Sequence, residues 1–243
     1  MIKKNTKLRV LTSLTLLALV FFMIKFNFIL AYVLIVLGTL SIIEFTQITK
    51  KIFQKRIYKY ISNIFFIIYL SLLCFFFFFF SNFIHMKAIL FILVFGCIAS
   101  DIGGFVVGRL FKGPRLTKIS PNKTYAGMIG SFFLSFIIGL IFVYTILNSN
   151  LAELYPQYFN FFYINLNDFW LLIFIFLISA VSQVGDLVIS YFKRLAKIKN
   201  TGNIIPGHGG LLDRVDGIIF AIPVAVLFNN FIDCYVFKLF CSG

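Results

Sequence analysis

Long apolar runs alternate with short polar segments along the chain. Seven runs stand out, the first within residues 1–24 and the others at about 26–46, 61–80, 87–108, 125–147, 169–192 and 217–240. Each is close to the ~20 residues that an α-helix needs to cross the hydrocarbon core of a bilayer. A helix satisfies its own backbone hydrogen bonds in lipid. The pattern therefore predicts an all-α fold, a polytopic membrane bundle of about seven transmembrane helices.

The first run begins like a secretory signal, with four basic residues before its apolar core, namely Lys3, Lys4, Lys7 and Arg9. A signal peptide ends in small residues at its cleavage site. Residues 21–25 read Phe-Phe-Met-Ile-Lys instead. We therefore expect this run to be retained as the first transmembrane helix.

The composition agrees with a membrane protein. Of the 243 residues, 61% are hydrophobic, 35 are Phe, and the mean hydropathy is +1.01. These values exclude a soluble globular domain. A net charge of +14 would suggest nucleic acid in a soluble protein, but here the cations suit cytoplasmic loops and anionic lipid headgroups, and no nucleic acid is expected. The four cysteines show no disulfide or zinc spacing, so we expect them to be packing residues.

The basic residues predict the orientation. Of the 22 Lys and Arg, 19 fall in alternate segments, with 4, 5, 5 and 5 in residues 1–9, 47–60, 109–124 and 193–216. Positive charge gathers on the cytoplasmic side of membrane proteins. We therefore expect a cytoplasmic N-terminus, an external C-terminus, and cytoplasmic loops at 109–124 and 193–216. The acidic loop at 148–168 contains no Lys or Arg and is expected on the other side.

Four aspartates are candidate functional residues because of their positions in or beside the apolar runs. Asp101 and Asp186 lie within apolar runs, where a carboxylate is costly unless it is paired or bound to a metal. A structural ion pair is an equally weighted alternative for Asp101. Asp213 and Asp216 are spaced i, i+3, which puts both on one helical face and suits a shared cation. Capping of the last helix is the alternative for Asp213.

Two loops have the composition of phosphate-binding turns. Residues 206–210 read Pro-Gly-His-Gly-Gly, a backbone that can turn and present N–H groups. Within it, His208 could instead be a structural hydrogen-bonding residue. Residues 120–124 read Ser-Pro-Asn-Lys-Thr. They suit either a phosphate or the capped start of the fifth helix.

The arrangement of these residues resembles the phosphatidate cytidylyltransferases, or CDP-diacylglycerol synthases. The matching motifs are Ser190-x-x-Lys193-Arg194, then Pro206-Gly207-His208-Gly209-Gly210-x-x-Asp213-Arg214-x-Asp216, with Gly185-Asp186-Leu187 upstream and a similar pattern in 100–127. The resemblance covers about 100–223. It divides the chain into poorly matched N-terminal spans, residues 1–86, and a catalytic membrane domain, residues 87–243.

The resemblance implies that CTP and phosphatidic acid react to give CDP-diacylglycerol and pyrophosphate at the cytoplasmic face of the cell membrane. It implies a catalytic set of Asp186, Lys193, Arg194, His208, Asp213, Arg214 and Asp216. It implies substrate-binding residues Asp101, Ser120, Lys123, Thr124, Ser190, Gly207, Gly209 and Gly210. The cofactor is expected to be Mg²⁺ on Asp186, Asp213 and Asp216, and a second monovalent or divalent cation is left open. Membrane lipids are the expected surroundings, and a homodimer is left open.

Three positions depart from the family pattern. Asn200 stands where the family usually has Asp, Ala126 where it has Glu, and Gly217 where it has Ser. The first two changes each remove a carboxylate from the region of the expected site. All three carboxylates of the expected magnesium site are nevertheless present, so we expect activity.

Two other functions fit parts of the sequence. The enzyme could act on another lipid phosphate, of the isoprenoid or archaeol type. The chain could also be a non-enzymatic transporter of an anion, with Asp101 and Asp186 as coupling groups. A transporter needs polar groups through the full depth of the membrane, whereas here they cluster near the cytoplasmic side.

Overall fold

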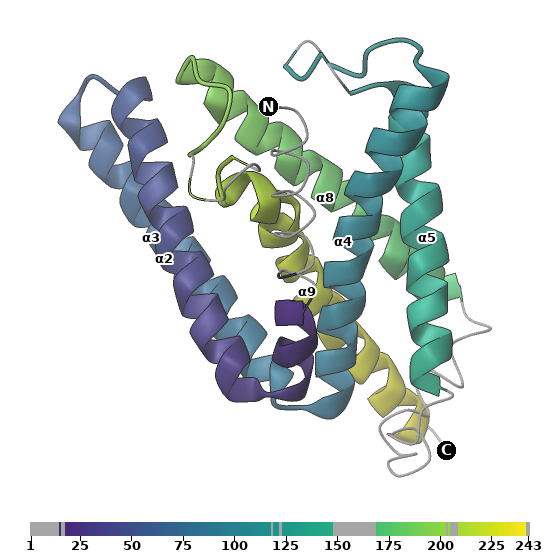
Figure 1. Cartoon of the computed structure of the whole chain (residues 1–243). Helices are drawn as coiled ribbons and strands as arrows, with labels where there is room; N and C mark the ends of the chain where they lie inside the picture. The colour runs from purple at the N-terminus through teal and green to yellow at the C-terminus, as the bar shows by residue number, and fades with distance from the viewer. Residues whose placement is uncertain are drawn as a thin grey trace. The chain divides into compact units, whose positions relative to one another are not determined.

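A computed structural model describes residues 15, 18–117, 119–121, 123–147, 169–202, 204 and 209–241 (Figure 1). The long helices in this part are α2 (Asn27–Ile52), α3 (Arg56–Ser81), α4 (Ile84–Phe111), α5 (Tyr125–Leu147), α8 (Phe169–Leu195) and α9 (Leu212–Cys241). An isolated bridge joins Arg115 and Thr124, and no strand appears among the elements of the described residues. The predicted all-α fold is confirmed.

In the described part of the chain, five helices are long and apolar enough to cross a membrane: α2, α3, most of α4, the first part of α5 and most of α8. The chain is thus a polytopic membrane protein. The 30-residue helix α9 covers the seventh predicted run. Of the first predicted run, residues 18–25 are helical and most of the others lie outside the described residues. The count of seven spans and the orientation remain predictions.

The predicted loop at 47–60 is wrong. Helix α2 continues to Ile52 and α3 begins at Arg56, so only residues 53–55 connect them. Lys, Gln and Thr do not break a helix, and a helix can continue beyond the apolar residues that fill the bilayer. The other two basic loops are shorter for the same reason: residues 112–124 follow α4, and residues 196–211 follow α8. The carboxylates of Asp213 and Asp216 therefore lie in the first turns of α9.

The structure divides into two compact units. The first comprises Met1–Asn82 and Val188–Asp216, and the second comprises Phe83–Leu187 and Gly217–Gly243. In the first unit, α2 and α3 lie side by side (Figure 1). Phe45 of α2 stacks on Phe66 of α3, with ring centroids 3.9 Å apart. The Thr49 hydroxyl donates to Asn63 Oδ1 at 2.7 Å. These contacts hold α2 and α3 as an antiparallel pair.

In the second unit, α4 and α5 pack closely through glycines (Figure 1). A Cβ atom at Gly103 would meet the carbonyl oxygen of Gly130, and one at Gly130 would meet Val107. Small residues allow helix backbones to approach each other in lipid, where packing replaces the hydrophobic effect as the main attraction between helices. The glycines of α4 and α5 therefore set the distance between these two helices.

We expect Gly103→Ala to lower the free energy of unfolding by about 1–3 kcal/mol, because the added methyl group meets backbone that cannot give way. Gly96→Ala on the same helix is the control. Its Cβ would come no closer than 3.4 Å to a neighbouring atom, Ile178 Cγ2, and alanine favours a helix more than glycine does. The melting temperature in detergent measures both. Equal melting temperatures would contradict the tight α4–α5 contact.

Candidate active site

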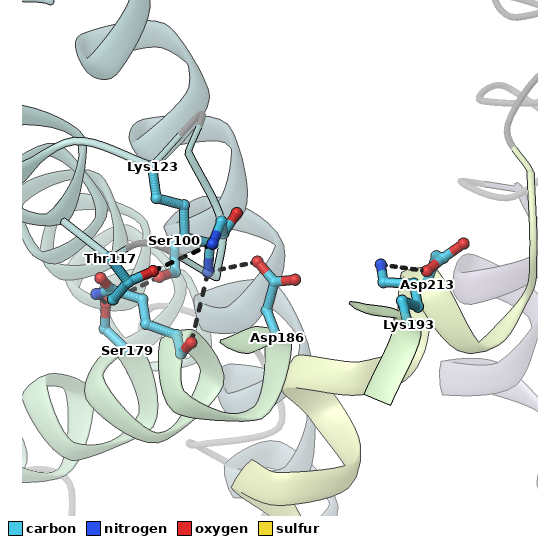
Figure 2. Close-up of polar contacts among 9 residues, drawn as sticks. Ser100, Thr117, Lys123, Ser179, Asp186, Lys193 and Asp213 are labelled. Carbon is cyan, nitrogen blue, oxygen red and sulfur yellow. Dashed lines mark hydrogen bonds and ion pairs between the residues drawn. The ribbon is translucent and has the colours of Figure 1, made fainter. Parts of the chain in front are cut away.

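The carboxylate of Asp186 forms an ion pair with Lys123. Asp186 lies on α8, and Lys123 Nζ is 2.5 Å from its Oδ2 (Figure 2). The same Nζ donates to the carbonyl oxygen of Gln183 at 3.4 Å. The side chains of Lys123 and Asp186 are 25% and 29% exposed. Two predicted site residues that are 63 positions apart in the sequence thus meet in the second unit, and both side chains are partly exposed.

The loop before α5 places Lys123. The backbone N–H of Leu116 donates to the Lys123 carbonyl oxygen at 2.7 Å, and the Lys123 N–H donates to the Ser120 carbonyl oxygen at 3.1 Å. The Ser120 N–H in turn donates to Thr117 Oγ1 at 3.2 Å. The loop therefore folds back on itself, and Ser120 takes part through its backbone.

Thr124 is the cap of α5. Its Oγ1 accepts a hydrogen bond from the N–H of Gly127 at 3.0 Å, in the first turn of the helix. Threonine at this position satisfies one of the N–H groups that a helix leaves without an internal partner. Of the two alternatives for residues 120–124, the structure supports the capped helix start for Thr124.

A second ion pair lies in the first unit. Lys193, near the end of α8, donates to Asp213 Oδ1 at 2.7 Å (Figure 2). The other oxygen of Asp213 accepts the backbone N–H of Thr201 at 2.9 Å. The side chains of Lys193 and Asp213 are 14% and 13% exposed. Asp213 therefore fastens both α8 and the following loop to the first turn of α9.

The other predicted site residues differ in exposure. Asp216 is 4% and Ser190 7% exposed, whereas Arg194, Arg214 and Asp101 are exposed. Gly209 has a φ of +85°, a conformation that favours glycine. Gly210 is buried. Gly207 and His208 lie outside the described residues.

Two further serines contribute to the second unit. Ser100 of α4 and Ser179 of α8 are buried, and their hydroxyl oxygens are 2.9 Å apart. Figure 2 shows this pair beside the Lys123 contacts. Ser182 lies next to Gly217, where a Cβ atom would meet the Ser182 hydroxyl. The departure from serine at position 217 therefore suits this chain, because Ser182 occupies that space.

The predicted metal ligands are the hard oxygen donors that Mg²⁺ prefers. Among the described residues, no three His, Cys, Asp or Glu side chains lie close enough together to hold a metal ion. Asp186 belongs to the second unit, and Asp213 and Asp216 belong to the first. Two of these carboxylates are paired with lysines. A magnesium ion shared by all three stays a prediction.

Glu44 was not predicted to belong to the site. It lies on α2, is 1% exposed, and accepts three hydrogen bonds. The donors are the Thr201 hydroxyl at 2.6 Å, the Leu211 N–H at 2.9 Å and the Leu212 N–H at 2.8 Å. A signal was present, since Glu44 is one of eight acidic residues and stands in an apolar run.

Comparisons with known proteins extend the match to almost the whole chain. The sequence profile of the cytidylyltransferase family matches residues 2–232. The phosphatidate cytidylyltransferase of Rickettsia prowazekii (strain Madrid E) is 35% identical over 236 residues, 95% of this chain and 94% of the relative. That of Rickettsia typhi (strain ATCC VR-144 / Wilmington) is 36% identical over 226 residues, 91% of each chain. That of Staphylococcus aureus (strain COL) is 39% identical over 127 residues, 51% of this chain and 42% of the relative.

Removal of the hydroxyl that caps α5 should lower the stability of the protein. We expect Thr124→Ala to lower the free energy of unfolding by about 1 kcal/mol. Thr124→Ser keeps the hydroxyl and should stay close to the wild type. Thermal unfolding in detergent measures the three proteins side by side. If the alanine variant melts with the wild type, the bond to Gly127 does not stabilise the helix.

Proposed function

Because the chain belongs to the cytidylyltransferase family, we propose that it transfers the cytidylyl group of CTP to phosphatidic acid, giving CDP-diacylglycerol and pyrophosphate. The observation that carries this proposal is the match to a phosphatidate cytidylyltransferase over 95% of the chain. The polar clusters around Lys123 and Lys193 suit substrates that carry several phosphates.

The reaction joins two anions. An oxygen of the phosphatidate phosphate attacks the α-phosphorus of CTP, the bond from this phosphorus to the bridging oxygen of the β-phosphate breaks, and pyrophosphate leaves. Phosphatidate is already ionised at neutral pH, so the attack needs no strong general base. The barrier is therefore largely electrostatic, and fixed cations lower it. Four of the predicted site residues supply these cations: Lys123, Lys193, Arg194 and Arg214.

The four cations divide into two kinds. Lys123 and Lys193 are already paired with carboxylates, so their positions are fixed before a substrate arrives, and little reorganisation is needed in the reaction. Arg194 and Arg214 also have contacts within the protein, but they are more exposed than the two lysines. An arginine presents a planar fork of donors that suits a phosphate. We assign the arginines to the first capture of phosphate groups and the lysines to their final placement.

We also propose that the reaction depends on Mg²⁺. Asp186, Asp213 and Asp216 would hold it, because carboxylate oxygens are its preferred ligands. When bound, Mg²⁺ neutralises charge on the phosphates and helps pyrophosphate to leave. A cytoplasmic site would agree with the distribution of basic residues along the sequence, and with the presence of CTP in the cytosol.

The direct test follows two labels on CTP. Purified protein is mixed with phosphatidic acid, Mg²⁺, and CTP labelled with ³²P at either the α- or the γ-phosphate. Label from the α-position should appear in the lipid, and label from the γ-position in pyrophosphate. Chelation of Mg²⁺ should stop both. An isoprenoid phosphate as acceptor tests the alternative substrate. Absence of α-label from the lipid with phosphatidate would overturn the proposal.

The second test concerns Asp213. We expect Asp213→Asn to lower turnover at least about tenfold, because the charge that holds Lys193 and the predicted cation is lost. Asp168→Asn, in the segment expected on the other side of the membrane, is the matched control and should keep normal turnover. Both variants are compared at equal amounts of folded, membrane-inserted protein. Normal Mg²⁺-dependent turnover in Asp213→Asn would exclude it from the site.

A further inference from the structure

The start of α9 has no capping side chain of its own. The helix begins at Leu212, so the capping position belongs to Leu211, which has no side-chain acceptor. The first N–H groups of any helix lack partners within the helix. Here the N–H groups of Leu211 and Leu212 donate to Glu44 Oε1 and Oε2 at 2.9 and 2.8 Å. A carboxylate from α2, 168 positions away from Leu212 in the sequence, replaces the missing cap.

The same carboxylate reaches Asp213 through one residue. The Thr201 hydroxyl donates to Glu44 Oε2 at 2.6 Å, and the Thr201 N–H donates to Asp213 Oδ2 at 2.9 Å. Thr201 is 3% exposed. Glu44 therefore holds both sides of Asp213: the loop residue bound to its carboxylate, and the helix turn from which its side chain extends.

Two glycines make room for Glu44. A Cβ atom at Gly202 would lie 2.5 Å from Glu44 Oε1. A Cβ atom at Gly210 would meet the Thr201 hydroxyl and lie 2.8 Å from Glu44 Oε2. Gly210 belongs to the turn in which the sequence suggests phosphate binding. Its missing side chain is already accounted for by the approach of Thr201 and Glu44.

Burial makes this arrangement specific. A carboxylate that is 1% exposed is costly unless donors surround it, and three donors meet Glu44. Withdrawal of any one donor leaves a buried acceptor with fewer partners. The loop end at Thr201 and the start of α9 are thus held in one arrangement.

We propose that Glu44 is a positioning residue of the cytidylyl transfer reaction: it fixes the start of α9 and Thr201, and through them the carboxylate of Asp213. The inference rests on the proposed function for its effect on turnover. Its structural part, the fixing of Thr201, Leu211 and Leu212 by Glu44, can be measured without any substrate. Glu44 itself touches no reacting atom in this proposal.

The central variant is Glu44→Gln. The amide keeps one oxygen but places an NH₂ group against a donor, so at least one of the three hydrogen bonds is lost. We expect turnover to fall at least about tenfold, with the KM for CTP within about twofold of the wild type. Thr201→Val, which removes only the hydroxyl, should show a smaller loss of the same kind, and Thr201→Ser should restore turnover.

Thr49→Val is the matched control. Thr49 lies on the same helix, is fully buried, and donates to Asn63 instead of to the α9 region. Amide hydrogen exchange supplies the readout that does not depend on activity. In Glu44→Gln, exchange should rise in peptides covering residues 201–214 and stay unchanged in α3. In Thr49→Val, exchange in 201–214 and turnover should match the wild type.

The outcomes separate the two proposals. If the wild type transfers no cytidylyl group, the proposed function fails, and the exchange experiment still decides whether Glu44 fixes the start of α9. If the wild type is active, unchanged exchange in 201–214 in the Glu44→Gln variant overturns the inference. Normal turnover in Glu44→Gln also overturns it. A loss of turnover in Thr49→Val as large as that in Glu44→Gln overturns it as well. Should Glu44→Gln fail to fold, Thr201→Val against Thr201→Ser applies the same criteria.

Discussion

A carboxylate in a membrane helix has to find donors inside the protein, and this constraint accounts for much of the observed structure. Glu44 accepts hydrogen bonds from two backbone N–H groups and a hydroxyl. Asp186 pairs with Lys123, and Asp213 pairs with Lys193 and accepts a hydrogen bond from the backbone N–H of Thr201. In each case the donors come from another part of the chain. The acidic residues thus act as the points where loops are fastened to helices.

The sequence predicted the helices well because each depends on a local property, an apolar run long enough to cross a bilayer. It predicted the loops less well. Hydropathy marks the point where a helix leaves the apolar layer, whereas the helix itself ends where its hydrogen bonding stops. Residues 47–52 are therefore polar and still helical. The cap by Thr124 could be foreseen, because it links residues only three apart.

The contacts among the candidate site residues could be predicted from the sequence only in part. Asp213 and Lys193 were expected in one site, but their direct ion pair joins two residues 20 positions apart and does not follow from local sequence. Glu44 was not predicted as a site residue, because its hydrogen-bond donors lie more than 150 positions away in the sequence. The matching motifs also begin only near residue 100, so they do not include the N-terminal helices. A rule applied to every intramembrane carboxylate, with or without a motif, would have included it.

A glycine in this chain can have either of two explanations: contact of its backbone with a ligand, or close packing against another part of the protein. A glycine-rich turn beside basic residues suggests a backbone that approaches a phosphate. At Gly210 the space left by the missing side chain is taken by Thr201 and Glu44, and at Gly103 a comparable space is taken by the backbone of α5. Gly209 has a positive φ, a backbone conformation that favours glycine. The turn thus owes part of its composition to a buried carboxylate on α2, so the N-terminal helices help to shape the segment that contains the expected catalytic residues.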